Sequence, residues 1–132
     1  MESAQSPTFL GSISPMPLLQ IQTSARSAEA SAPTALLKTL SSMLARELSK
    51  PESYVMLGLE HDAELFFGGT NAPACVAVLK NIGTFTPAQT EKLSALLCAK
   101  LSEALGVAPN RIYIEFVDAK PHLWGYDGGT FA

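Results

Sequence analysis

The stretch LARELSKPESYVMLGLE, residues 44–60, is matched in the second half of the chain by LSEALGVAPNRIYIEFVD, residues 101–118. In each stretch an amphipathic helix ends, a turn containing a proline follows, and an apolar strand begins. The second strand is the clearer one, because Ile112, Ile114 and Phe116 alternate with the residues between them. This internal repeat predicts a fold built from two β-α-β units.

The helices and the remaining strands can be placed outward from this repeat. Leucine and methionine at helical spacing predict a first helix from Pro33 to the Lys50-Pro51 turn. A second helix is predicted from Thr86-Pro87-Ala88-Gln89, a capping box with proline at the first helical position, to a glycine C-cap at Gly106. The predicted strands cover residues 18–23, 53–60, 74–80 and 111–118, with a short strand over 65–70 that ends in a glycine turn.

The predicted order of elements is β-α-β-β-α-β. It indicates the α+β class: a split β-α-β, ferredoxin-like pseudo-repeat, with a four-stranded sheet and two helices on one face. The other face of the sheet would be left open. Because its residues are also apolar, we expect neighbouring subunits to bury it.

Composition narrows the classes of function. A chain of 132 residues with 47% apolar and 16% charged residues is expected to form one globular domain. The net charge of −3 gives no basic surface, which argues against nucleic acid as a partner. No apolar run reaches the ~18–20 residues of a membrane span. Cys75 and Cys98 form no CxxC pair and are expected to be two small buried thiols.

Residues 1–16 are predicted to be a flexible N-terminal extension or a mis-assigned start, and residues 17–132 the folded domain. The extension contains one charge, Glu2, and no lysine or arginine, so it does not read as a signal peptide. We therefore expect a cytoplasmic protein and leave leaderless secretion open.

Met16-Pro17 has two interpretations. Either Met16 is the true start and Pro17 becomes the N-terminus, or Pro17 simply opens a strand.

From Pro17 to Ala132 the chain resembles the macrophage migration inhibitory factor family of the tautomerase superfamily. The resemblance rests on short motifs in matching order: Met16-Pro17, Lys50-Pro51 followed by Ser53-Tyr54-Val55, Phe67-Gly68-Gly69-Thr70, Asn81-Ile82-Gly83, Arg111-Ile112-Tyr113-Ile114, Gly125-Tyr126 and Thr130-Phe131-Ala132. It implies a homotrimer whose sheets form a central barrel, with an active site at each subunit boundary. It also implies keto–enol tautomerisation of phenylpyruvate-like or dopachrome-like small aromatic acids, with no cofactor.

The resemblance assigns the catalytic role to Pro17. A free proline nitrogen is a secondary amine, and burial together with a nearby cation such as Lys50 lowers its pKa toward neutrality, where a general base works best. Within a peptide bond the same nitrogen is an amide without basicity. Catalysis therefore requires Pro17 to be the chain terminus.

The other implied site residues bind the substrate. Lys50 would hold the substrate carboxylate by charge, Ile82 would offer its backbone N–H, and Tyr113 of the neighbouring subunit would contribute its hydroxyl and ring. An aromatic wall for a phenyl ring would be formed by Trp124, Tyr126 and Phe131.

Several positions depart from the family pattern. Leu18 follows the proline where methionine stands in the best-known member. Glu115 occupies a position that is often asparagine, and its carboxylate would repel an anionic substrate or pair with Lys50. Tyr126 replaces a tryptophan, with Trp124 two positions earlier, so the aromatic wall would be rearranged. The positions of the family CxxC read Ala74-Cys75-Val76-Ala77, so no thiol–disulfide oxidoreductase activity is predicted.

Two alternatives to the enzyme remain open on the sequence. The chain could be a cytokine-like ligand that acts through a cell-surface receptor, although no receptor-specific motif can be identified. It could also be an inactive trimeric scaffold if residues 1–16 stay attached and block Pro17.

Overall fold

The computed structural model describes residues 16–26 and 33–132, so the prediction for residues 1–15 lies outside the described residues. The elements follow one another in this order: β1 (Pro17–Thr23), α1 (Pro33–Leu48), η2 (Glu52–Tyr54), β2 (Met56–Glu60), β3 (Cys75–Ile82), α2 (Pro87–Leu105), η3 (Pro109–Arg111), β4 (Ile112–Ala119), η4 (Pro121–Leu123), β5 (Gly125–Tyr126) and β6 (Gly129–Thr130).

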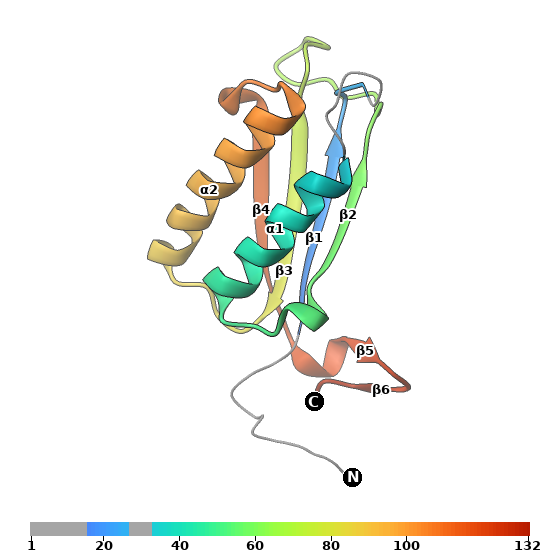
Figure 1. Cartoon of the computed structure of the whole chain (residues 1–132), viewed down its shortest axis with the longest axis vertical. Coiled ribbons are helices and arrows are strands. Elements are labelled where there is room, and N and C mark those ends of the chain that lie inside the picture. The colour runs from blue at the N-terminus through green and yellow to red at the C-terminus, as the bar shows by residue number, and fades with distance from the viewer. Residues whose placement is uncertain (1–15, 27–32) are drawn as a thin grey trace.

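Four strands form one mixed sheet in the order β2-β1-β3-β4. β1 runs parallel to β2 and antiparallel to β3, and β3 runs parallel to β4. Both helices cover the same face of this sheet (Figure 1). The predicted α+β class and split β-α-β arrangement are therefore confirmed, and the trimeric barrel stays a prediction.

The core lies between the helices and the sheet. Alternate residues of β1 and β3 point toward the helices, and Leu19 and Leu79 have no exposed surface. Leu40 and Leu44 of α1 and Leu97 of α2 are equally buried against them. Burying each such leucine contributes about 1.5–3 kcal/mol, so this layer accounts for most of the stability.

Local sequence chemistry sets the ends of α2. Thr86 accepts a hydrogen bond from the Gln89 N–H at 3.1 Å, and the Gln89 side chain accepts one from the Thr86 N–H at 3.0 Å. Gly106 ends the helix with φ of 69°, a left-handed conformation that glycine adopts without strain. The predicted capping box and C-cap are both confirmed.

Two strand predictions were wrong, one in its extent and the other altogether. The strand expected over residues 53–60 begins only at Met56, because residues 52–54 after Pro51 form a 3₁₀ turn. Residues 65–70 form no strand. Instead Gly68 and Gly69, at φ of 63° and 79°, turn the chain back so that Phe67 and Thr70 make one isolated bridge.

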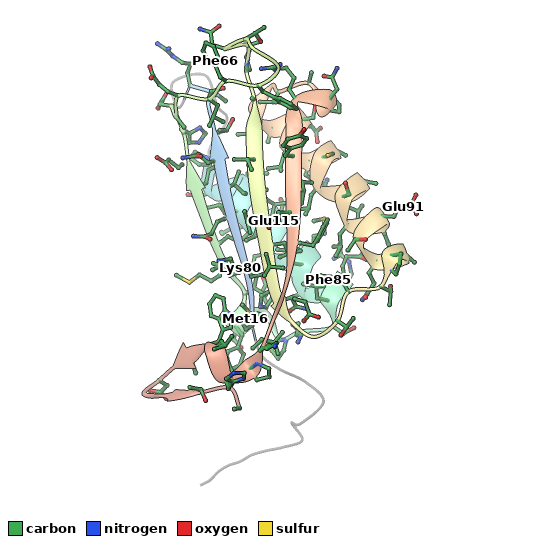
Figure 2. All side chains as sticks on the ribbon, turned by 180° about the vertical axis from the view of Figure 1, so that it is seen from behind. Met16, Phe66, Lys80, Phe85, Glu91 and Glu115 are labelled. Atoms are coloured by element: carbon green, nitrogen blue, oxygen red, sulfur yellow. The ribbon has the colours of Figure 1, made fainter. Side chains whose placement is uncertain are left out.

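The open face of the sheet is mixed rather than apolar. Leu18, Val76 and Val78 share it with polar side chains, including Lys80 and Glu115, which Figure 2 labels on this side. The other polar residues on this face are Gln20, Gln22 and Glu60, and the Gln22 amide donates to the Glu60 carboxylate at 3.0 Å. The expectation of an apolar face was therefore only partly right.

Within residues 16–26 and 33–132, neither long helix has the length and apolar character that crossing a bilayer would require.

Candidate active site

The Pro17 end of the sheet brings several predicted site residues together. β1 begins there at Pro17, which lies opposite Asn81 of β3. β3 and β4 finish at the same end, where Ile82 pairs with Ala119. The segment carrying η4, β5 and β6 continues from this end, as Figure 1 shows. We refer to this region as the Pro17 end.

Pro17 is deeply enclosed. Its side chain is less than 2% exposed, and the preceding Met16 is 5% exposed. Met16 lies at the end of the sheet from which the β5–β6 segment projects (Figure 2). In the chain as described, the Pro17 nitrogen is part of the Met16–Pro17 peptide bond and has no basicity. Its position at the start of β1 fits both interpretations of Met16-Pro17.

Lys50 also lies at the Pro17 end, on the connection between α1 and η2. α1 terminates just before it, where Ser49 adopts a left-handed φ of 53° and the Lys50 N–H donates to the Ala45 carbonyl at 3.0 Å. The Lys50 Nζ donates a hydrogen bond of 3.1 Å to the Ile82 carbonyl. Burial lowers the pKa of the Lys50 ammonium below its usual value of 10.5. A partly desolvated cation is thus held next to the strand that pairs with Pro17.

Ile82 contacts Lys50 through its carbonyl oxygen, and its side chain is 4% exposed. Gly83 follows with φ of 124° and turns the backbone away from the strand. The role predicted for the Ile82 N–H, a hydrogen bond to a substrate carboxylate, stays a prediction.

Three aromatic rings gather beyond the sheet. The Tyr126 and Phe131 rings stack with centroids 5.5 Å apart and an interplanar angle of 11°. The Tyr54 ring meets the Tyr126 ring edge-on, also at 5.5 Å. Trp124 joins this segment through its carbonyl, which accepts a hydrogen bond of 3.1 Å from the Phe131 N–H. Two of the three predicted wall residues therefore stack directly.

Tyr54 is a contact that sequence reasoning missed. It belongs to the Ser53-Tyr54-Val55 motif, but no role was assigned to it. The available signal was its closeness to Lys50, four residues earlier, on the connection that leads into β2. Its ring contact with Tyr126 spans most of the chain and becomes visible only in the folded structure.

Tyr113 lies at the opposite end of the sheet. It pairs with Val76 near the start of β4, while Ala119 marks the Pro17 end six residues later. At the usual strand rise this separation is about 20 Å. The Tyr113 side chain is 65% exposed, with its ring 4.7 Å from the Phe67 ring. One subunit does not bring Tyr113 to Pro17, so its predicted role depends on a neighbouring subunit.

Glu115 lies halfway along β4, an edge strand of the sheet, where it faces the open side and pairs with Val78 of β3. Its side chain is exposed, and among the residues that the structure describes it takes part in no salt bridge. The expected pairing of Glu115 with Lys50 is therefore not made within one subunit.

Both cysteines are free thiols, Cys75 buried and Cys98 partly buried. Burial raises the pKa of the Cys75 thiol to about 12, and the nearby Cys98 adds to this effect. A thiol that is so poorly ionised is a weak nucleophile. This agrees with the interpretation of Cys75 as a core residue.

Comparison with known proteins identifies the class to which this fold and site belong. A family model described as macrophage migration inhibitory factor (MIF) matches residues 16–132. The macrophage migration inhibitory factor of Mus musculus is 35% identical over 117 residues, covering 89% of this chain and 100% of that protein. The chain therefore belongs to the macrophage migration inhibitory factor family, as its motifs indicated.

Solved structures agree with this assignment. A macrophage migration inhibitory factor homologue from Prochlorococcus marinus has 40% sequence identity and a TM-score of 0.81, covering 87% of this chain and 99% of that one. The macrophage migration inhibitory factor from Trichinella spiralis has 33% identity and a TM-score of 0.80, with 86% and 99% of the two chains covered.

Proposed function

We propose that this protein is a keto–enol tautomerase that acts on small aromatic 2-keto acids such as phenylpyruvate, with the amine of an N-terminal Pro17 as general base. The observation that carries the proposal is the position of Lys50. Its ammonium is anchored on Ile82, at the end of the sheet where β1 begins with Pro17. A base and a cation at one site are what proton transfer on an anionic keto acid requires.

The proposed reaction consists of two proton transfers. The neutral Pro17 nitrogen removes a proton from the carbon next to the keto group, leaving an enolate and a prolinium ion. The prolinium then returns this proton to the enolate oxygen, which gives the enol and restores the neutral base. The Lys50 charge stabilises the substrate carboxylate and the negative charge that develops on the enolate. It also lowers the pKa of the Pro17 amine, because two neighbouring cations repel.

The aromatic group beyond the sheet supports the choice of an aromatic substrate. Tyr54, Tyr126 and Phe131 contact one another through their rings and reach the Pro17 end from η2 and from the β5–β6 segment. Such a group offers a planar apolar surface to a phenyl ring. In this proposal Tyr113 completes the site from a neighbouring subunit of a homotrimer.

The test compares three chains that share residues 17–132. One begins at Pro17, one carries a single alanine before Pro17, and the third is the full chain of 132 residues. We expect phenylpyruvate tautomerase activity, followed by ultraviolet absorbance, only in the chain that begins at Pro17. Loss of a general base lowers the rate by about 10²–10⁴-fold.

The alanine chain is the control that separates chemistry from steric blocking. It turns the Pro17 amine into an amide but adds only one small residue. Equal activity in all three chains would assign the base to another group, and inactivity of all three would leave a non-catalytic member of the family. Activity in the alanine chain but not in the full chain would show that residues 1–16 act by covering the site.

A further inference from the structure

Asn81 is a buried polar residue that the proposed mechanism does not use. Its side chain is 6% exposed, and its Oδ1 has no hydrogen-bond donor among the described residues. Buried polar atoms are almost always paired, because an unpaired one loses its hydration without compensation. The unpaired Oδ1 of Asn81 is therefore expected to accept a hydrogen bond from a donor in the functional protein.

The sheet register places this acceptor beside Pro17. Asn81 of β3 lies directly opposite Pro17 of β1 in the antiparallel ladder. Both residues are buried members of strands whose alternate side chains face the helices, so their side chains lie on the same face. Directly opposite Cβ atoms in such a pair are about 4.5–5.5 Å apart. The Asn81 amide is therefore within reach of the atoms around the Pro17 nitrogen.

The Pro17 nitrogen has no hydrogen as long as Met16 precedes it, so it cannot satisfy Asn81. A Pro17 that begins the chain has one N–H as a neutral amine and two as a prolinium ion. We propose that Asn81 is a positioning residue for the catalytic amine: its buried Oδ1 accepts an N–H of Pro17 when the chain begins there. This inference rests on the proposed function, because it requires the same free amine.

The hydrogen bond would orient the nitrogen and set its basicity. An acceptor bonds more strongly to the charged prolinium than to the neutral amine, so Asn81 raises the pKa of Pro17. Other charged groups act on the same site. Lys50, on the connection after α1, lowers that pKa, and Asp118 of β4, in register with Asn81, raises it. Lys80 alternates with Asn81 along β3 and faces the open side.

A titration without substrate tests the inference. A chain beginning at Pro17 retains every element from β1 to β6 and all but one of the residues that match the family model, so we expect it to fold. The 15N resonance of Pro17 in proline-labelled protein would be followed against pH, and the alanine-extended chain identifies it, because an amide nitrogen does not titrate. We expect the Pro17 pKa to fall by about one pH unit in Asn81→Leu and to rise by about one unit or more in Asn81→Asp.

The control is Asn71→Leu, which changes an exposed loop asparagine and should leave the Pro17 pKa unchanged. Equal pKa values in the wild type and in both Asn81 variants would overturn the inference. This outcome is distinct from failure of the proposed function, since the titration needs a free amine but no catalysis. A chain that titrates as expected yet lacks tautomerase activity would keep Asn81 as the partner of Pro17 and reject the enzyme.

Thermal unfolding gives an independent readout if a variant proves difficult to label. Asn81→Leu removes an unpaired acceptor from the full chain but removes a hydrogen bond from the chain beginning at Pro17. We therefore expect the substitution to leave Tm unchanged or raise it in the full chain, and to lower Tm in the shorter chain. The same change of Tm in both chains would contradict a bond between Asn81 and Pro17.

Discussion

The guanidinium of Arg111 holds Phe67 by two contacts at once: its Cζ lies 5.1 Å from the centroid of the Phe67 ring, and its Nη1 donates to the Phe67 carbonyl at 3.0 Å. The remaining donors of Arg111 bind three more carbonyls of the same loop, those of Thr70, Ala72 and Pro73. The Phe67 ring packs on Tyr113, two residues along from Arg111. One side chain thus fastens the loop before β3 to the start of β4.

We expect Arg111→Lys to destabilise the protein by about 1–3 kcal/mol, because a lysine ammonium is a compact charge that cannot span four carbonyls or stack on a ring. Urea unfolding of the full chain measures this change. Arg46→Lys is the control, since Arg46 is an exposed residue in the last turn of α1 and should shift the free energy of unfolding by less than about 0.5 kcal/mol. Equal effects of the two substitutions would mean that the carbonyl contacts contribute nothing.

Lys50 should contribute to substrate binding and to catalysis. In a chain beginning at Pro17, we expect Lys50→Met to lower kcat/KM for phenylpyruvate by about 10–100-fold, through a higher KM and a lower kcat, because a charged hydrogen bond is worth about 1.5–3 kcal/mol. Steady-state kinetics over a range of substrate concentrations measures it. Lys80→Met, on the open face, is the matched control and should retain activity. A loss of similar size in both variants would point to net charge instead of a specific contact.

The lowered pKa of Lys50 also predicts a pH dependence of stability. The folded chain binds this proton less tightly than the unfolded chain, whose lysine has a pKa near 10.5. Between the two pKa values the unfolded state holds more protons, so stability rises with pH and levels off above about 10.5. In the full chain Pro17 has no titratable amine. There we expect the Tm of the wild type minus the Tm of Lys50→Met to increase as pH rises from 8 toward 10.5. A constant difference would show that Lys50 is fully solvated.

Cys75 should resist alkylation in the folded protein. Its pKa of about 12 lies three units above the ordinary thiol value of 9.0, so at pH 8 its thiolate is about a thousandfold scarcer, before its burial is considered. We expect iodoacetamide to modify Cys98 first and Cys75 only after addition of urea, as read by peptide mass mapping. Modification of both thiols at one rate in the native protein would contradict the buried position of Cys75.

The sequence was most informative where local chemistry decides structure. The ends of α2 follow from Thr86, Gln89 and Gly106, whose effects act within one turn of the chain. It was least informative where contacts connect distant segments. Tyr54 meets Tyr126 only because η2 and β5 converge on one end of the sheet.

Asn81 is a second residue whose role could not be predicted from the sequence. It stands in a motif that was recognised, but its significance lies in an unpaired oxygen and in the register with Pro17. Neither property can be read before the strands are paired, since a shift of one residue would turn the side chain to the other face. The strand predicted over 65–70 failed for a related reason. The strand was predicted from its apolar residues, and that pattern carries no information on how Gly68 and Gly69 reverse the chain.

The separation of Tyr113 from the Pro17 end predicts that variants can complement each other. If each site takes Pro17 and Lys50 from one subunit and Tyr113 from its neighbour, then Lys50→Met and Tyr113→Ala chains are each strongly impaired alone. In randomly mixed trimers, a site is intact when a Tyr113→Ala subunit supplies Lys50 and a Lys50→Met subunit supplies Tyr113. Equal mixing makes about a quarter of the sites intact.

The measurement is phenylpyruvate tautomerase activity after the two variants, both beginning at Pro17, are unfolded together and refolded. We expect about a quarter of the wild-type activity from the mixture and about a tenth or less from either variant treated alone. The double variant mixed with wild type is the control, because it also forms mixed trimers but cannot gain activity beyond the wild-type sites already present. If refolded mixtures are no more active than the separate variants, Tyr113 and Lys50 do not meet across a subunit boundary, and the site is built without Tyr113.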